Sequence, residues 1–157
     1  MRTVRMSETS TKTAARTETL STFATLNFAG DALAPEKVSA ILGVDPTTGY
    51  RKGEVYRRSR GHETRGRTGL WHLSTRRIVD SDDLADHLRR LVAVICPEGH
   101  GNHISALREL MARDDLEADV SCFWYGSAGA QPPAIPAFAQ EVFDRLGATI
   151  ETDFDTD

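Results

Sequence analysis

The sequence has few cysteines and no long apolar run. Its 157 residues include two cysteines, Cys96 and Cys122, which are too few for the disulfide framework of a small secreted domain. No apolar stretch approaches the roughly 20 residues that cross a bilayer, and the N-terminal region lacks the continuous apolar core of a secretory signal. We therefore expect a cytoplasmic protein with buried thiols and no membrane partner.

The sequence motifs of several enzyme classes are also missing. There is no phosphate-binding P-loop, no G-x-S-x-G nucleophile elbow and no dinucleotide fingerprint after the first predicted strand. Asp82, Asp83 and Asp86 lie next to His87, but a Ser81 N-cap followed by an acidic first helical turn explains these carboxylates better than catalysis does. We predict no catalytic residue, and the absences favour a protein that is not an enzyme.

The apolar periodicity predicts one domain. Residues 1–20 are rich in Thr, Ser and Arg without any period, which predicts a flexible tail ahead of a single domain at 21–157. Apolar alternation predicts strands over 22–28, 50–56, 70–75, 118–125 and 150–155. Helical spacing predicts helices over 35–42, 84–95, 102–111 and 138–146.

The order of these elements predicts the fold class. Hairpins mixed with helical crossovers are typical of an α+β domain, with a mainly antiparallel sheet and helices packed on one face. A ferredoxin-like arrangement is one form of this class that fits the order. The last strand has an acidic face, and if it lies at an exposed edge it could form a homodimer by pairing across a two-fold axis.

Positive charge is concentrated in one connection. The chain carries a net −4, yet residues 51–77 hold nine Lys and Arg against two Glu, a net +7, which leaves −11 for the remainder. We predict a basic loop at 51–69, with glycines at 61, 66 and 69 that keep its backbone mobile. The predicted partner-binding residues are Arg51, Lys52, Arg57, Arg58, Arg60, Arg65 and Arg67.

Three interpretations of this loop remain open. It could bind an acidic protein, or grip a nucleic-acid backbone with His62 or Tyr56 as stacking groups. It could also be a solvated hairpin whose arginines pair with the protein's own carboxylates, including Glu151, Asp153 and Asp155. The negative remainder of the chain disfavours nucleic acid. Our leading hypothesis is a non-enzymatic binding protein, an immunity-like or antitoxin-like module that engages an acidic macromolecular partner.

A second set of residues has the chemistry of a metal site. Cys96, His100 and His103 lie within eight residues, and Cys122 could supply a fourth zinc ligand. The alternatives are therefore a structural zinc site or a small metal-dependent hydrolase. Because the spacing matches no common zinc module, a polar loop beside a core cysteine explains these residues better. We predict no metal and no cofactor.

Four segments of the sequence together resemble a known family. They are FATLNFAGD at 23–31, YRKGE at 50–54, TGLWHLS at 68–74 and VSCFW at 120–124. The chain is similar, over about residues 21–156, to small bacterial proteins of the family catalogued as domain of unknown function 4279. The resemblance implies a compact α+β domain and a bacterial cytosolic origin, but no activity, cofactor or catalytic residue. The arginine-rich connection and the loop at 96–103 depart from that pattern.

Overall fold

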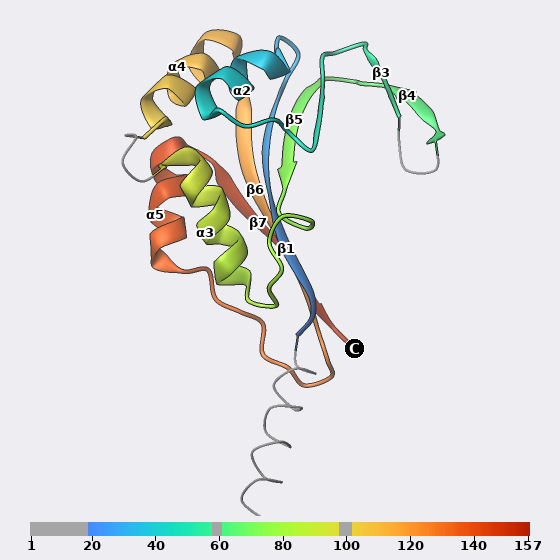
Figure 1. Ribbon diagram of the computed structural model, residues 1–157, viewed down its shortest axis with the longest axis vertical. Helices are drawn as coiled ribbons and strands as arrows, with labels where there is room; N and C mark the ends of the chain where they lie inside the picture. The colour runs from blue at the N-terminus through green and yellow to red at the C-terminus, as the bar shows by residue number, and fades with distance from the viewer. Residues whose placement is uncertain (1–18, 58–60, 98–101) are drawn as a thin grey trace, which may run out of the picture.

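A computed structural model of the chain describes residues 19–57, 61–97 and 102–157 (Figure 1). The predicted tail at 1–20 lies outside these residues except for its last two, which begin the first strand. The central sheet has five strands in the order β2-β5-β1-β6-β7. They are β1 (Thr19–Gly30), β2 (Thr48–Tyr50), β5 (Gly69–Ser74), β6 (Glu117–Gly126) and β7 (Thr149–Thr156).

The sheet is mostly antiparallel, as predicted. β1 pairs antiparallel with both β5 and β6, and β2 pairs antiparallel with β5. β7 alone is parallel to its neighbour, β6, because the helix between them carries the chain back to the same end of the sheet. The predicted α+β class is confirmed.

Within the described residues, four helices cover one face of the sheet (Figure 1). They are α2 (Pro35–Leu42), α3 (Leu84–Ile95), α4 (Ile104–Asp114) and α5 (Ala137–Leu146). Pro35 fits the start of α2 because its ring fixes the helical φ, and Gly43 ends that helix in a left-handed conformation at φ 73°. The N-cap of α3 is Asp83, so the prediction of Ser81 as the cap is wrong by two residues.

Two connections interleave the strands. The chain passes from β1 through α2 to β2, and in the sheet β5 lies between these two strands. It then passes from β5 through α3 and α4 to β6, and in the sheet β1 lies between those two. β7 is added in parallel beyond β6, at an edge of the sheet. The narrower prediction of a ferredoxin-like arrangement is not confirmed.

The core lies between the sheet and the helices. Trp71 is fully buried, its ring packs edge-on against Phe28 at 5.8 Å, and its indole Nε1–H donates to Ser39 Oγ at 3.0 Å. Burying a large apolar side chain contributes about 1.5–3 kcal/mol, so these residues hold β1 and β5 against α2. Trp71 and Leu73 both face the core from β5, as the alternation over residues 70–75 implies.

The basic connection between β2 and β5 forms a separate two-stranded sheet. It consists of β3 (Val55–Arg57) and β4 (Glu63–Arg65). The single strand predicted over 50–56 is therefore wrong: β2 ends at Tyr50, and a turn closed by the Glu54 N–H on the Arg51 carbonyl at 3.1 Å separates it from β3. Gly53 provides the left-handed backbone of this turn at φ 83°.

No helix within the described residues combines the length and the apolar character needed to span a membrane.

Candidate binding surface on the basic arm

The base of the connection is held by close packing against Tyr50. We call the described residues 51–57 and 61–67 the basic arm. The rings of Tyr50 and Tyr56 stack in parallel, with centroids 4.1 Å apart and 5° between their planes. Gly66 lies directly against Tyr50, since a Cβ at Gly66 would come within 2.6 Å of two ring carbons. This glycine therefore permits close packing, a role that the prediction of a mobile backbone missed.

Backbone hydrogen bonds continue the arm from its base into the hairpin. The Gly53 N–H donates to the Gly66 carbonyl at 2.9 Å, and the Gly66 N–H donates to the Glu54 carbonyl at 2.9 Å. Val55 then pairs with Arg65 in the β3–β4 ladder. The hairpin extends from one end of the sheet, on the side away from the helices (Figure 1). The sequence therefore builds an ordered projection here.

Two of the predicted binding residues are paired at this base. Arg51 forms an ion pair with Glu36 of α2, and Lys52 Nζ lies 3.0 Å from Asp31 Oδ2. Hydrogen bonds from Lys52 and Thr68 lower the pKa of Asp31 and keep it ionised. Arg51 and Lys52 therefore contribute less free positive charge than the sequence count implies.

The other described arginines of the arm, Arg57, Arg65 and Arg67, have little compensating negative charge. Arg57 Nε lies 3.9 Å from Glu63 Oε1. Arg65 donates to the Gly53 carbonyl at 3.1 Å, but this hydrogen bond does not neutralise the positive charge of its guanidinium group. Arg67 is exposed and has no ion pair with any residue in the described part of the chain. The predicted residues Arg58 and Arg60 lie outside the described residues.

The acidic strand β7 lies far from this arm. Glu151, Asp153 and Asp155 are exposed, and β7 is at the opposite edge of the sheet from β2. Across residues 19–57, 61–97 and 102–157, no ion pair joins β7 to the arm. In the described part of the chain, the carboxylate partners of the arm are therefore those near its base and Glu63.

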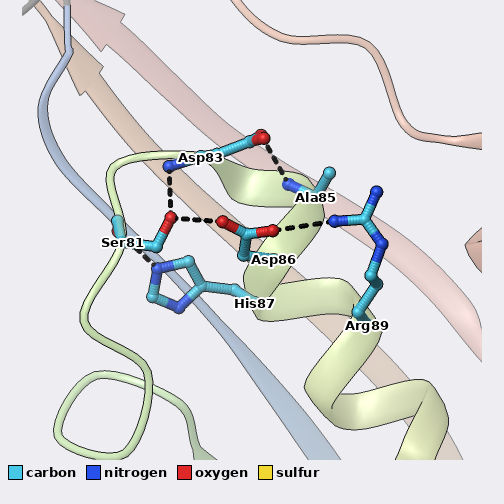
Figure 2. A network of polar contacts seen from close by, with 6 residues as sticks. All are labelled: Ser81, Asp83, Ala85, Asp86, His87 and Arg89. Atoms are coloured by element: carbon cyan, nitrogen blue, oxygen red, sulfur yellow. Dashed lines mark hydrogen bonds and ion pairs between the residues drawn. The ribbon is translucent and has the colours of Figure 1, made fainter.

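The carboxylates near His87 form a helix cap (Figure 2). Asp83 Oδ1 accepts the Ala85 N–H at 3.0 Å, while Ser81 Oγ donates to Asp86 Oδ2 at 2.6 Å. Arg89 Nη1 lies 2.7 Å from Asp86 Oδ1. These contacts satisfy the polar groups at the start of α3, which supports the capping interpretation over the catalytic one.

His87 itself is buried beneath this cap. Its side chain is 1% exposed, with Nε2 2.8 Å from the Ser81 carbonyl oxygen and Nδ1 2.6 Å from Thr75 Oγ1. Both ring nitrogens thus have protein partners. The imidazole joins the segment before α3 to the end of β5, and its role is structural.

The candidate metal ligands are only partly described. Cys122 is buried, and burial raises its pKa to about 11; burial also raises the pKa of Cys96. Zinc binds the thiolate form of cysteine. Because burial favours the protonated thiol at both positions, it disfavours zinc binding there. His103 precedes α4, whereas His100 lies outside the described residues. Within those residues, no three His, Cys, Asp or Glu side chains are grouped so that they could hold a metal ion.

A polar network that the sequence did not predict crosses three strands on the face without helices. Asn27 Nδ2 donates to Asp119 Oδ1 at 2.8 Å, and His72 Nδ1 lies 2.5 Å from Asn27 Oδ1. His72 is half-buried, which lowers its pKa, whereas the charge of Asp119 acts in the opposite direction. Strand alternation predicts that Asn27, His72 and Asp119 point to this face. The contacts among the three side chains depend on strand register, which the alternation does not determine.

Comparison with known proteins identifies the family and gives no activity. The chain matches the domain of unknown function DUF4279 over residues 18–157, nearly its whole length, and it belongs to this family. No curated protein and no solved structure matches the chain. The expected family is therefore confirmed.

Proposed function

We propose that this DUF4279 domain is a non-enzymatic binding protein of the cytoplasm whose basic arm engages an acidic macromolecular partner, in an immunity-like or antitoxin-like role. One observation carries the proposal: Arg57, Arg65 and Arg67 lie on an ordered projection, and among the described residues Glu63 is the only carboxylate that forms an ion pair with any of the three. Arginine suits such a surface because its planar guanidinium binds a carboxylate through two parallel hydrogen bonds.

The packing at the base supports the same proposal. A binding loop that is already ordered loses less conformational entropy when it meets a partner. The Tyr50–Tyr56 stack and the close approach of Gly66 order the base of the arm before any partner is present. Val55, which is 50% exposed between the arginines, adds an apolar contact that a partner could cover.

The proposal is tested with a defined acidic probe. A fluorescent peptide of about twelve residues, rich in glutamate, is titrated with the protein at low salt and followed by anisotropy. The test variant carries Arg57→Gln, Arg65→Gln and Arg67→Gln. Each lost exposed pair is worth about 0.5–1 kcal/mol, so together they should weaken binding about 10–150-fold.

A matched control keeps the total charge equal to that of the arm variant. It carries Arg90→Gln, Arg113→Gln and Arg145→Gln, three exposed arginines on the helices. We expect this variant to bind the peptide nearly as well as the wild type. Equal loss in both triple variants would mean that net charge, and not the arm, controls binding.

The nucleic-acid alternative is separated by a second probe. A single-stranded oligonucleotide should bind weakly, because the chain outside residues 51–77 carries a net −11. Oligonucleotide binding tighter than peptide binding, with a steep loss of affinity as salt rises, would replace the proposed partner with nucleic acid.

A further inference from the structure

The face of the sheet without helices carries an aromatic hollow. The rings of Phe23 on β1 and Phe123 on β6 stack with centroids 4.9 Å apart and 22° between their planes. Both rings are half-buried, and a hollow of about 340 Å³ lies beside them, with Glu151 and Asp153 of β7 in its lining. The Arg76 guanidinium lies 5.3 Å from the centroid of Phe23, so this surface already accepts an arginine from its own chain.

Strand register places carboxylates beside these rings. Asp153 is the neighbour of Phe123 in the β6–β7 ladder, and Glu151 and Asp155 lie two residues to either side on the same face. All three side chains are exposed. Among the described residues β7 pairs with β6 alone, so its outer edge is open. The hollow is therefore aromatic at its centre and negatively charged along its β7 side, while the Arg76 guanidinium lies over the Phe23 ring.

The basic arm has the complementary pattern. Val55, Arg57 and Arg65 share one face of the β3–β4 hairpin, because Val55 pairs with Arg65 and Arg57 follows Val55 by two residues. Val55 is one of two large apolar residues that are exposed in the described part of the chain. The arm thus presents an apolar centre with two guanidinium groups beside it, and Glu63 lies opposite Arg57 on the same face and pairs with it.

The arm lies far from the hollow of its own molecule. It joins β2 to β5 at one edge of the sheet, whereas β7 forms the other edge, three strands beyond β5. The hairpin also extends from one end of the sheet while β7 ends at the opposite end (Figure 1). A second copy of the chain can present its hollow to this arm without any change in fold.

We propose that the basic arm of one copy docks on the hollow beside Phe23 and Phe123 of a second copy, with Val55 against the rings and the arginines against the β7 carboxylates. This inference rests on the proposed function, since it names a second copy as an acidic partner of the arm. It also replaces β7–β7 pairing, which would place Glu151, Asp153 and Asp155 of the two copies close together and repel them.

Charge reversal tests the docking through two variants. The arm variant carries Arg57→Glu and Arg65→Glu, and the hollow variant carries Glu151→Lys and Asp153→Lys. Sedimentation velocity is measured for each protein over about 10–500 μM at low and high salt. We expect the wild type to associate at low salt and to dissociate as salt rises, because exposed charges are screened. Each variant alone should be monomeric, since like charges then face each other.

The mixture of the two variants gives the decisive result. An equimolar mixture should associate, because each contact again joins opposite charges. A control with Arg90→Glu and Arg113→Glu should associate like the wild type, and circular dichroism checks that every variant is folded. A monomeric wild type, variants that still associate, or a mixture that stays monomeric would each overturn the inference.

These outcomes are separable from those of the proposed function. Binding of the glutamate peptide to a wild type that is monomeric would leave the proposed function standing and remove the second copy as partner. Failure of the wild type to bind the peptide, together with monomeric behaviour, would remove both.

Discussion

The packing of Gly66 on Tyr50 gives a quantitative prediction about the base of the arm. In Gly66→Ala, the new Cβ would lie 2.6 Å from the ring, whereas carbon atoms in contact lie about 3.5–4.0 Å apart. Tyr50 would have to move by about 1 Å, and it is stacked on Tyr56. Overpacking of this kind costs about 1–3 kcal/mol, so we expect the free energy of unfolding to fall by that amount.

The cost should largely disappear when the ring is removed. Gly66 does not have the positive φ that would oppose alanine, and the close contact that remains is the Thr68 carbonyl oxygen, 3.1 Å from the new Cβ. In a Tyr50→Ala background, Gly66→Ala should therefore destabilise the fold by less than in the wild type, because the ring clash is gone and the lower entropy of the unfolded chain, worth about 0.4–1 kcal/mol, opposes the remaining contact. Urea unfolding of the four proteins gives the coupling free energy between the two positions. Equal destabilisation in both backgrounds would refute the packing argument.

Three other predictions concern the body of the domain. Asp83→Ala should lower the free energy of unfolding by about 1 kcal/mol, because the cap of α3 is lost. Asp83→Asn keeps a side-chain oxygen that can accept the Ala85 N–H, so it should lose much less stability in thermal unfolding. Equal losses in the two variants would exclude the cap as the cause. Burial lowers the pKa of His72, so the unfolded chain takes up the proton first as pH falls, and stability should decline below about pH 6.5. Urea titrations at several pH values should show a smaller decline in His72→Gln, and an identical decline would contradict this assignment. Burial raises the pKa of Cys122 to about 11, so iodoacetamide at pH 8 should leave this thiol unmodified in the native protein and alkylate it in urea. Mass spectrometry distinguishes the two forms. Rapid alkylation of Cys122 in the native protein would contradict its burial.

Local patterns predicted the regular elements because each depends on neighbouring residues. Alternation around Trp71 and Leu73 identified β5, and Pro35 and Gly43 marked the ends of α2. The division of the strand predicted over 50–56 was missed. It follows from the turn at Gly53 and from the contact of the Tyr50 ring with Gly66, sixteen residues further along the chain. Intrinsic propensity alone does not encode that contact.

The charges of the arm could be predicted, but their pairing could not. The sequence shows the arginines directly, whereas the ion pairs of Arg51 with Glu36 and of Lys52 with Asp31 span 15 and 21 residues. Those pairs exist because α2 and the end of β1 lie beside the base of the arm. The hollow beside Phe23 likewise depends on the β1–β6 register, which joins residues about one hundred positions apart.

The central claim is that the basic arm is the binding surface. The most direct test maps which residues of the protein contact the bound peptide. ¹⁵N-labelled protein is titrated with the glutamate-rich peptide, and amide chemical shifts are followed residue by residue. The largest changes should fall on the amides of β3, β4 and Gly66 through Thr68, and they should disappear in the triple arm variant. Changes confined to the helices or to β7, with the hairpin amides unmoved at saturation, would contradict the claim.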